Sequence, residues 1–363
     1  MNANSSAQML PPVSSVGRLA WLKENLFSSP LNTLLTVLVS WLLVMMVPAM
    51  LDWLFFEADF TSDTAQDCRQ AAGACWAFIA EKHRLILFGV YPYDEQWRPL
   101  LATLVLVAAL ICSAIRVFWK PWLVVMWTFA LIAVAVLMWG GVFGLSYVEN
   151  DRWGGLPLTL ILSTFGIAFA FPMGVLLALG RRSHMPAIKS LCIIYIELIR
   201  GVPLISLLFM SSVMLPLFLP EGFTIDKLLR AQIAIILFAA AYIAETVRGG
   251  LQSIPKGQYE GADSLGLSYW QQIRLIILPQ ALRVVIPPLV GIFIALFKDT
   301  SLVVIIGIFD LTQAAKAAIA DAAWRGFSVE AYVFIAVIYF IFCFAISRYS
   351  QGLERHLDKG YQR

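Results

Sequence analysis

The segment LPLTLILSTFGIAFAFPMGVLLAL, residues 156–179, contains no charged side chain. A helix needs roughly 20 mostly apolar residues to cross about 30 Å of hydrocarbon, so this segment is long enough to span a membrane. Pro172 within it is tolerable, because neighbouring helices can satisfy the backbone group that a proline leaves free. The sequence therefore predicts a membrane-spanning helix at this position.

Seven further segments have the same character, and together they predict an all-α, polytopic membrane protein with about eight transmembrane helices. They are 31–51, 99–117, 122–143, 190–218, 229–248, 281–306 and 329–347. The composition agrees, because 60% of the 363 residues are hydrophobic and only 13% are charged, whereas a soluble domain has about 25% charged residues. The first apolar segment lacks a convincing small-x-small cleavage site, so we expect it to be retained as a helix rather than removed as a signal peptide.

Basic residues are distributed unevenly between alternate connections. One set of connections, which includes Arg181, Arg182 and Lys189, holds more Lys and Arg than the other set. The positive-inside rule predicts that this set is cytoplasmic, together with both termini. The opposite set includes the long connection 52–98, which contains Cys68 and Cys75. An oxidising compartment would let these two cysteines pair, but at a separation of seven residues they can equally well stay free.

The connection 248–283 is long and patterned. It contains two short amphipathic segments, 258–265 and 268–277, with Gly266 between them. A sharp corner between two helices favours a residue that can adopt positive φ, which glycine does readily. Pro255 and Pro279 bracket the unit as helix breakers. The pattern predicts an ordered hairpin that docks on a partner; the alternative is a solvated connection with helical propensity.

This connection resembles the EAA loop of bacterial ABC import permeases, Glu-Ala-Ala-x3-Gly-x9-Ile-x-Leu-Pro. The matching positions are Glu260, Gly261, Ala262, Gly266, Ile276, Leu278 and Pro279, with every spacing kept. One position departs from the pattern, since Gly261 stands where the pattern has Ala, and glycine costs up to about 1 kcal/mol inside a helix. The resemblance implies that the loop inserts into a cytoplasmic ATPase, and that Glu260, Ala262 and Gly266 transmit its movement.

Flanking segments are similar to the histidine/glutamine-type permeases of polar amino-acid ABC importers. They are 155–163, 199–203, 245–250, 254–258, 278–280 and 298–302. This resemblance covers residues about 153–350, and the stretch 69–76 resembles the larger membrane subunit of general L-amino-acid ABC transporters. Together with the predicted spans, these resemblances imply four parts. Residues 1–30 form a cytoplasmic segment, and residues 31–152 form a three-helix extension with a periplasmic loop 52–98. Residues 153–350 form a type I ABC importer permease core with the coupling loop 248–283, and residues 351–363 form a cytoplasmic tail.

The resemblance further implies a permease subunit that forms the translocation path of an ATP-driven importer of L-amino acids, with broad specificity, in the bacterial inner membrane. The chain has no Gly-x4-Gly-Lys-[Ser/Thr] loop and no Gly-Lys dipeptide, so it lacks the usual cradle for nucleotide phosphates. ATP and Mg would be bound by a partner ATPase dimer, and no cofactor by this chain. The other implied partners are a second, related permease subunit, a periplasmic amino-acid-binding protein and the lipid bilayer; none is a nucleic acid.

Among the ionisable residues within the predicted spans, four are candidates for the substrate path: Glu197, Arg200, Lys298 and Asp299. Such residues cost roughly 2.5–3.5 kcal/mol each on insertion scales, so they usually face a cavity or one another. An amino-acid zwitterion carries both signs of charge, and these four residues could line its path. The alternative is pairwise neutralisation: Glu197 and Arg200 share a helix face, and Glu245 and Arg248 repeat that spacing. For the second pair we favour the structural interpretation.

Three alternatives remain open at this point. The chain could serve an importer of one polar amino acid or of another small polar solute. An ion-coupled secondary transporter would need inverted repeats. The motif Glu-x-x-Arg-Gly occurs twice, at 197–201 and 245–249, but it is too short to be such a repeat. A membrane-embedded enzyme would need a catalytic constellation; the three histidines are far apart in the sequence and lack metal-ligand spacing. We therefore expect a subunit without enzymatic activity of its own.

Overall fold

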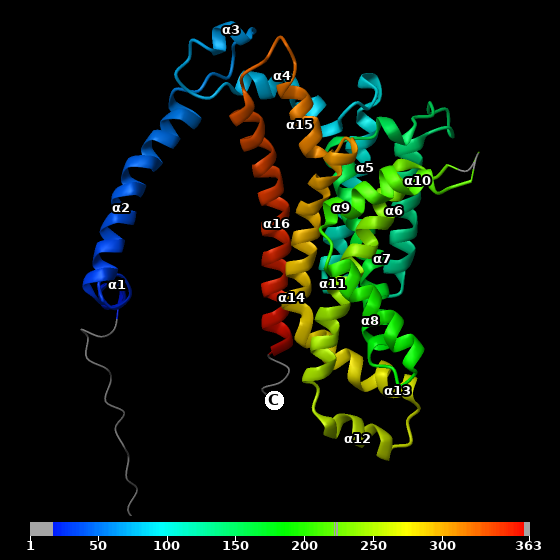
Figure 1. The fold of residues 1–363 in the computed structure, drawn as a ribbon. Coiled ribbons are helices and arrows are strands. Elements are labelled where there is room, and N and C mark those ends of the chain that lie inside the picture. The colour runs from blue at the N-terminus through cyan, green and yellow to red at the C-terminus, as the bar shows by residue number, and fades with distance from the viewer. Residues whose placement is uncertain (1–16, 221, 223, 359–363) are drawn as a thin grey trace, which may run out of the picture. The chain divides into compact units, whose positions relative to one another are not determined.

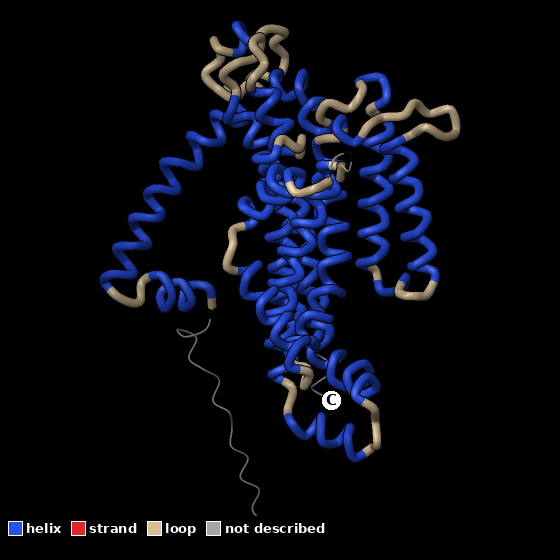
Figure 2. The backbone as a smooth tube through the Cα atoms, turned by 45° about the vertical axis from the view of Figure 1, so that its right-hand side comes forward, coloured by secondary structure: helices blue, strands red, loops and turns tan. Residues whose placement is uncertain are grey.

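A computed structural model describes residues 17–220, 222 and 224–358, and the regular elements within these ranges are helices (Figures 1 and 2). The predicted all-α class is thereby confirmed. Contacts divide the chain into two compact units, residues 1–77 and 78–363. The boundary that the sequence predicts at residue 152 remains a prediction.

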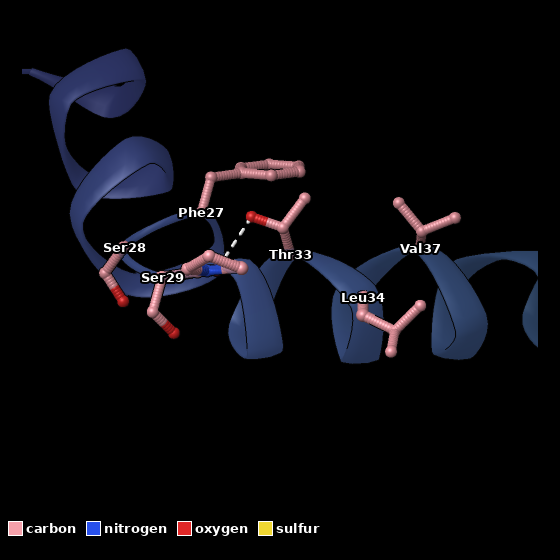
Figure 3. A pocket seen from close by; sticks show the side chains of 7 residues that line it. Phe27, Ser28, Ser29, Thr33, Leu34 and Val37 are labelled. Atoms are coloured by element: carbon pink, nitrogen blue, oxygen red, sulfur yellow. Dashed lines mark hydrogen bonds between the residues drawn. The ribbon is translucent and has the colours of Figure 1, made fainter.

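Unit 1 contains α1 (Arg18–Leu26), α2 (Pro30–Leu51), a π turn (Asp52–Phe56) and α3 (Ala65–Cys68). Ser29 begins α2, because its side chain accepts the backbone N–H of Asn32 and Pro30 occupies the first turn. The helical run Pro30–Phe56 is long and apolar enough to cross a membrane. At the corner between α1 and α2 there is an open pocket of about 580 Å³, lined by Phe27, Ser28, Ser29, Pro30, Thr33, Leu34 and Val37. In it Thr33 donates a hydrogen bond to the carbonyl of Ser29 (Figure 3).

The segment that follows α2 folds back on the end of that helix. The indole N–H of Trp76 donates to the carbonyl of Leu54 at 2.8 Å. Gly73 lies against the backbone of Glu57, where an added Cβ would meet the carbonyl carbon at 2.3 Å, so only glycine fits. A disulfide joins Cys68 to Cys75, with their Cα atoms 5.7 Å apart. This cross-link closes the loop over a sequence separation of 7 residues.

Unit 2 is a helical bundle. Its long helices are α5 (Trp97–Ala114), α6 (Trp122–Trp139), α7 (Gly155–Arg181), α8 (Pro186–Arg200), α11 (Lys227–Ser253), α14 (Leu278–Asp299) and α16 (Ser328–Asp358). Its shorter helices are α4 (Trp76–Phe88, shared with unit 1), α9 (Leu204–Phe209), α10 (Leu215–Leu217), α12 (Lys256–Ser264), α13 (Tyr269–Gln272) and α15 (Leu311–Ile319). In Figure 1, α12 and α13 lie at one end of the bundle, and α4 and α15 lie at the other.

The core of unit 2 forms where α7 and α11 pack closely. Small residues permit this approach, as they do in many membrane helix pairs. A Cβ on Gly174 of α7 would lie 2.6 Å from the side chain of Ile243, and a Cβ on Gly250 of α11 would lie 2.4 Å from Val285 of α14. Buried alanines continue the contact along both helices. The bundle therefore depends on glycine and alanine at positions that the apolar composition alone does not single out.

The predicted spans are found as seven long apolar helical runs and one bent pair. The bent pair is α8 and α9–α10, which meet at an angle of 101°. The span predicted over 190–218 is thus divided into two helical segments by this bend. The reason is local, because Pro203 lacks a backbone N–H and disfavours the helical conformation of the residue before it.

Arg98 is fully buried near the start of α5. Its guanidinium forms an ion pair with Glu95 and donates to the backbone carbonyls of Leu137, at 2.8 Å, and Ser146, at 3.0 Å. A Cβ on Gly140 would collide with this guanidinium. One buried charge thus fixes the loop after α6 against α5, where its hydrogen bonds offset much of the cost of burial.

Asp310 joins the beginnings of α7 and α15. It is fully buried, and its carboxylate accepts the backbone N–H groups of Thr312 and Gln313 at the first turn of α15. The neighbouring backbone N–H of Leu311 donates to the hydroxyl of Thr159 in α7. Burial raises the pKa of the Asp310 carboxyl to about 6, although the helix N–H groups favour its ionised form.

We predict that Asp310→Asn makes the protein more stable at neutral pH. The folded protein binds the Asp310 proton more tightly than the unfolded chain does, so this group lowers stability as pH rises from about 4 to about 6. Between about pH 4 and pH 6 the free energy of unfolding falls by about 3 kcal/mol at most on account of this group. Asparagine keeps one of the two acceptor oxygens of the helix cap and stays uncharged. Thermal unfolding in detergent should show an advantage for the variant at neutral pH that disappears toward pH 4; an advantage independent of pH would contradict the prediction.

Candidate coupling hairpin and charged cluster

Residues 255–279, here called the coupling hairpin, follow α11 and contain α12 and α13. Pro255 precedes α12, where its fixed φ suits a helix start. The helix ends at Ser264, and Gly266 just beyond it has a φ of +68°. The backbone N–H of Leu267 donates to the carbonyl of Ala262. Apart from its chain neighbours, no atom of the described residues lies within 4 Å of a Cβ added at Gly266. Glycine is therefore favoured here by backbone conformation and not by crowding.

A capping box starts the second half of the hairpin. Ser268 and Gln271 satisfy each other's backbone N–H groups at the beginning of α13. The chain then continues through a π turn (Ile273–Ile277) directly into α14. The expectation that Pro279 breaks the helix is wrong, because this proline lies in the first turn of α14 and the π turn before it absorbs the irregularity.

Side-chain hydrogen bonds hold the two halves of the hairpin together. The amide of Gln272 donates to the carbonyl of Tyr259 at 2.9 Å and to the carboxylate of Asp263 at 3.1 Å. The amide of Gln280 donates to the side chain of Gln258 at 2.9 Å. The hairpin is thus an ordered unit rather than a solvated connection.

The residues of the resembling motif divide into supporting and exposed positions. Ala262 is buried, Ile276 and Leu278 are half-buried, and Glu260, Gly261, Gly266 and Pro279 are exposed. An alanine at Gly261 would meet no atom within 4 Å, so the departure at this position leaves the geometry of α12 unchanged. The supporting positions face the bundle, and the exposed ones face away from the interior.

The hairpin also exposes large apolar side chains that the sequence analysis did not single out. Leu265 is 75% exposed and Trp270 is 65% exposed, and Leu275 and Tyr269 are exposed near them. Apolar side chains on the outside of a rigid polar hairpin are typical of a protein-binding surface. Their signal in the sequence was the apolar face of the two amphipathic segments.

A charged cluster lies between α7, α8 and α11. The carboxylate of Glu245 accepts hydrogen bonds from Arg181 at 3.1 Å and from Nε of Arg248 at 3.0 Å, and Arg200 lies 3.8 Å away. Arg181 also forms an ion pair with Glu197 at 2.9 Å. Hence the two predicted path residues on α8 do not pair with each other. Instead, each pairs with a charge on a neighbouring helix.

The other two predicted path residues lie outside this cluster. Lys298 and Asp299 are at the last turn of α14, where Lys298 is exposed and Asp299 is half-buried. Neither has an ion-pair partner within 4.0 Å among the residues that the structure describes. Arg181, the residue that joins Glu197 to Glu245, was missed, because no local pattern links positions 64 residues apart.

We predict that Glu245→Gln destabilises the protein, because three arginines lose their shared carboxylate. Breaking a fully buried pair costs about 3–5 kcal/mol. Since 23% of the Glu245 side chain is exposed, a loss of about 2 kcal/mol is expected. Thermal unfolding in detergent checks this prediction, with Glu149→Gln, an exposed carboxylate in a loop, as the matched control. Equal stability of the two variants would show that the cluster contributes little.

Comparison with known proteins bears on both features. Residues 170–359, which include the coupling hairpin and the whole charged cluster, match the family model described as "Binding-protein-dependent transport system inner membrane component". Over 352 residues the chain is 53% identical to the "Inner membrane amino-acid ABC transporter permease protein YhdY" of Escherichia coli, with 94% of each chain covered.

A second relative and a solved structure agree with this match. The chain is 40% identical over 418 residues to the "Glutamate/glutamine/aspartate/asparagine transport system permease protein BztC" of Rhodobacter capsulatus, covering 97% of this chain and 96% of that one. A crystal structure of an amino acid ABC transporter with histidines is 34% identical, with a TM-score of 0.50, and covers 56% of this chain and 92% of its own. The chain belongs to the family of inner membrane components of binding-protein-dependent transport systems, as the resemblance implied.

Proposed function

We propose that this chain is the permease subunit that forms the translocation path of an ATP-driven importer of L-amino acids with broad specificity. The observation that carries the proposal is the similarity over almost the whole chain to two permeases whose names specify amino acids. One of these names lists four amino acids that differ in charge, which supports a permissive path. An importer of one polar amino acid or of another small polar solute is the narrower alternative.

The coupling hairpin is the proposed contact with the ATPase dimer, which would bind ATP and Mg. Its exposed Leu265 and Trp270 would enter the ATPase surface, and Glu260 would face it with a negative charge. Ala262, Ile276 and Leu278 support the hairpin from inside. A hairpin held by its own hydrogen bonds moves as one piece, which suits it for transmitting a displacement between two proteins.

The remaining partners and the orientation form part of the proposal. One permease core per chain needs a second membrane half, and we propose a related permease subunit, with a periplasmic amino-acid-binding protein that delivers the substrate. The end of unit 2 that carries α12 would be cytoplasmic, in keeping with Arg181, Arg182 and the positive-inside rule. The sequence prediction of a periplasmic loop 52–98 would also put Cys68 and Cys75 in the periplasm, where a disulfide persists.

Lys298 and Asp299 are the stronger candidates for the substrate path. Their charges lie within a predicted span and have no ion-pair partner among the described residues. Ionisable residues in hydrocarbon usually face a cavity or one another. An ammonium and a carboxylate without ion-pair partners are therefore suited to bind the carboxylate and the ammonium of a zwitterion. Glu197 forms an ion pair with Arg181, and Arg200 forms one with Glu245. These two residues would therefore contribute to the path through the charged cluster.

The proposal is tested by uptake of a panel of labelled L-amino acids in cells with and without this chain, at matched expression of the neighbouring subunits. Loss of uptake of several unlike amino acids is the expected result. Loss of one alone would favour the narrower importer, and loss of none would reject amino acids as substrates. Uptake that continues after collapse of the ion gradient but stops on ATP depletion excludes an ion-coupled secondary transporter.

Gly266→Pro and Glu260→Arg are predicted to abolish transport while the chain still inserts into the membrane. Proline requires φ near −65°, which is incompatible with the φ of +68° at Gly266, and arginine reverses the charge that faces the ATPase. We expect uptake to fall at least about tenfold, within the range of coupling between distant sites. Gly261→Ala, on the same helix, is the matched control and should transport normally. Normal uptake by both test variants would remove the coupling role of the hairpin.

Asp299→Asn is predicted to weaken the apparent affinity for substrate about tenfold, the value of one hydrogen bond to a charged group. The measurement is the KM of uptake, with Asp151→Asn, an exposed carboxylate in a short 3₁₀ helix, as control. Arg200→Gln should lower uptake through the charged cluster and reduce thermal stability as well. An unchanged KM and rate in both variants would leave these charges with a structural role only.

A further inference from the structure

The coupling hairpin is attached to the end of α7 by one arginine that lies outside the hairpin and outside its motif. The guanidinium of Arg182 donates to the hydroxyl of Tyr259 on α12 at 2.9 Å and to the carbonyl of Leu251 at 2.7 Å. The Tyr259 hydroxyl itself donates to the same carbonyl at 3.1 Å. The guanidinium carbon also lies 5.4 Å from the centre of the Tyr259 ring.

The local structure explains why these groups meet. Leu251 is in the last turn of α11, where carbonyls lack a helical partner, so its oxygen accepts both donors. Arg182 follows the last residue of α7, and a positive charge is favourable at the C-terminus of a helix. The ring of Tyr259 packs against the main core of unit 2. Three elements, α7, α11 and α12, therefore meet at one hydroxyl group.

The preceding residue, Arg181, connects the same end of α7 to α8. It forms an ion pair with Glu197 of α8 at 2.9 Å and with Glu245 of α11 at 3.1 Å. Consecutive residues on a helix point in different directions, so Arg181 and Arg182 reach different neighbours from one short segment. A continuous set of contacts thus runs from Tyr259 through Arg182 and Arg181 to Glu197.

These contacts lead to the main irregularity of the bundle. Three residues beyond Glu197, α8 ends at Arg200, and the chain bends by 101° before α9. A break of this kind can absorb a change of angle between two rigid segments. The hydrogen bonds of Gln272 and Gln280 fix α12 to its own hairpin and to α14, whereas the Arg182 contact fixes it to a helix that the hairpin does not adjoin in sequence.

We propose that Arg182 and Tyr259 are positioning residues that transmit a displacement of α12 through the end of α7 to α8 and the bend at Gly201–Pro203. The inference rests on the proposed function, because it assumes that an ATPase moves α12. It adds the route by which that movement enters the bundle. Motif resemblance assigns no role to Arg182, which lies 77 residues before Tyr259.

The test uses the complete transporter in proteoliposomes, with its partner permease, ATPase and binding protein, and an equimolar mixture of labelled L-amino acids as the probe. Uptake and ATP hydrolysis are measured in the same vesicles. Tyr259→Phe keeps the ring and removes only the hydroxyl, and Arg182→Gln removes the guanidinium. We expect ATP hydrolysis to continue at the wild-type rate, while amino acid taken up per ATP hydrolysed falls about fivefold or more in each variant.

In the double variant the ratio should fall by less than the product of the two single fold-changes, because both changes remove the hydrogen bond between Arg182 and Tyr259. Tyr332→Phe and Arg355→Gln, which alter exposed residues of α16, are the matched controls and should keep the wild-type ratio. A purely structural role would lower uptake and hydrolysis together and leave their ratio unchanged, which would overturn the inference. An unchanged ratio with unchanged rates would overturn it as well.

The design separates this inference from the proposed function. Suppose that wild-type vesicles show ATP-dependent uptake and that Gly266→Pro uncouples uptake from ATP hydrolysis. If Tyr259→Phe and Arg182→Gln then keep the wild-type ratio of uptake to hydrolysis, the inference alone fails. If the wild-type vesicles show no ATP-dependent uptake of the mixture, the proposed function fails and the inference fails with it.

Discussion

Backbone N–H and C=O groups that lie in hydrocarbon find no water, so each of them must be satisfied within the protein. This constraint accounts for the long uninterrupted runs of α7 and α11 and for the way the chain departs from regular helix elsewhere. Prolines at 48, 172, 287 and 288 remain inside helices, and the π turns at 52–56, 210–214 and 273–277 keep the backbone helical. Because hydrocarbon provides little hydrophobic drive between helices, close packing at Gly174 and Gly250 holds the bundle together instead.

The same constraint governs the charges. A carboxylate such as Glu245 is tolerable near the end of a span because Arg181, Arg200 and Arg248 surround it. Their mutual attraction offsets the cost of removing them from water, provided that hydrogen bonds complete the set. The cluster consequently fixes the relative positions of α7, α8 and α11 near the end that carries the coupling hairpin. Lys298 and Asp299 lack such neighbours among the described residues, which is the reason they stand apart as candidates for substrate contact.

The coupling hairpin combines two properties that seldom occur together in a loop. Its polar groups bond to one another and to the ends of α7, α11 and α14, so its shape is defined without a partner. Its large apolar side chains nevertheless point outward, at Leu265 and Trp270 above all. An ordered surface loses little conformational entropy on binding, and its rigid attachment lets a displacement at the surface reach the bundle.

Composition and local pattern determined the all-α class, the positions of the spans, the corner at Gly266 and the pairing of Glu245 with Arg248. Each of these follows from neighbouring residues: from hydrophobic periodicity, from turn chemistry or from an i, i+3 spacing. Resemblance to a family supplied the motif positions. Tertiary structure alone decided that Glu197 pairs with Arg181, that Arg182 reaches Tyr259, and that Pro279 continues a helix instead of ending it. Partners in these contacts lie up to 77 residues apart, and which of them meet depends on how closely α7 and α11 pack. That distance is set by shape complementarity at small residues, and no local pattern encodes it.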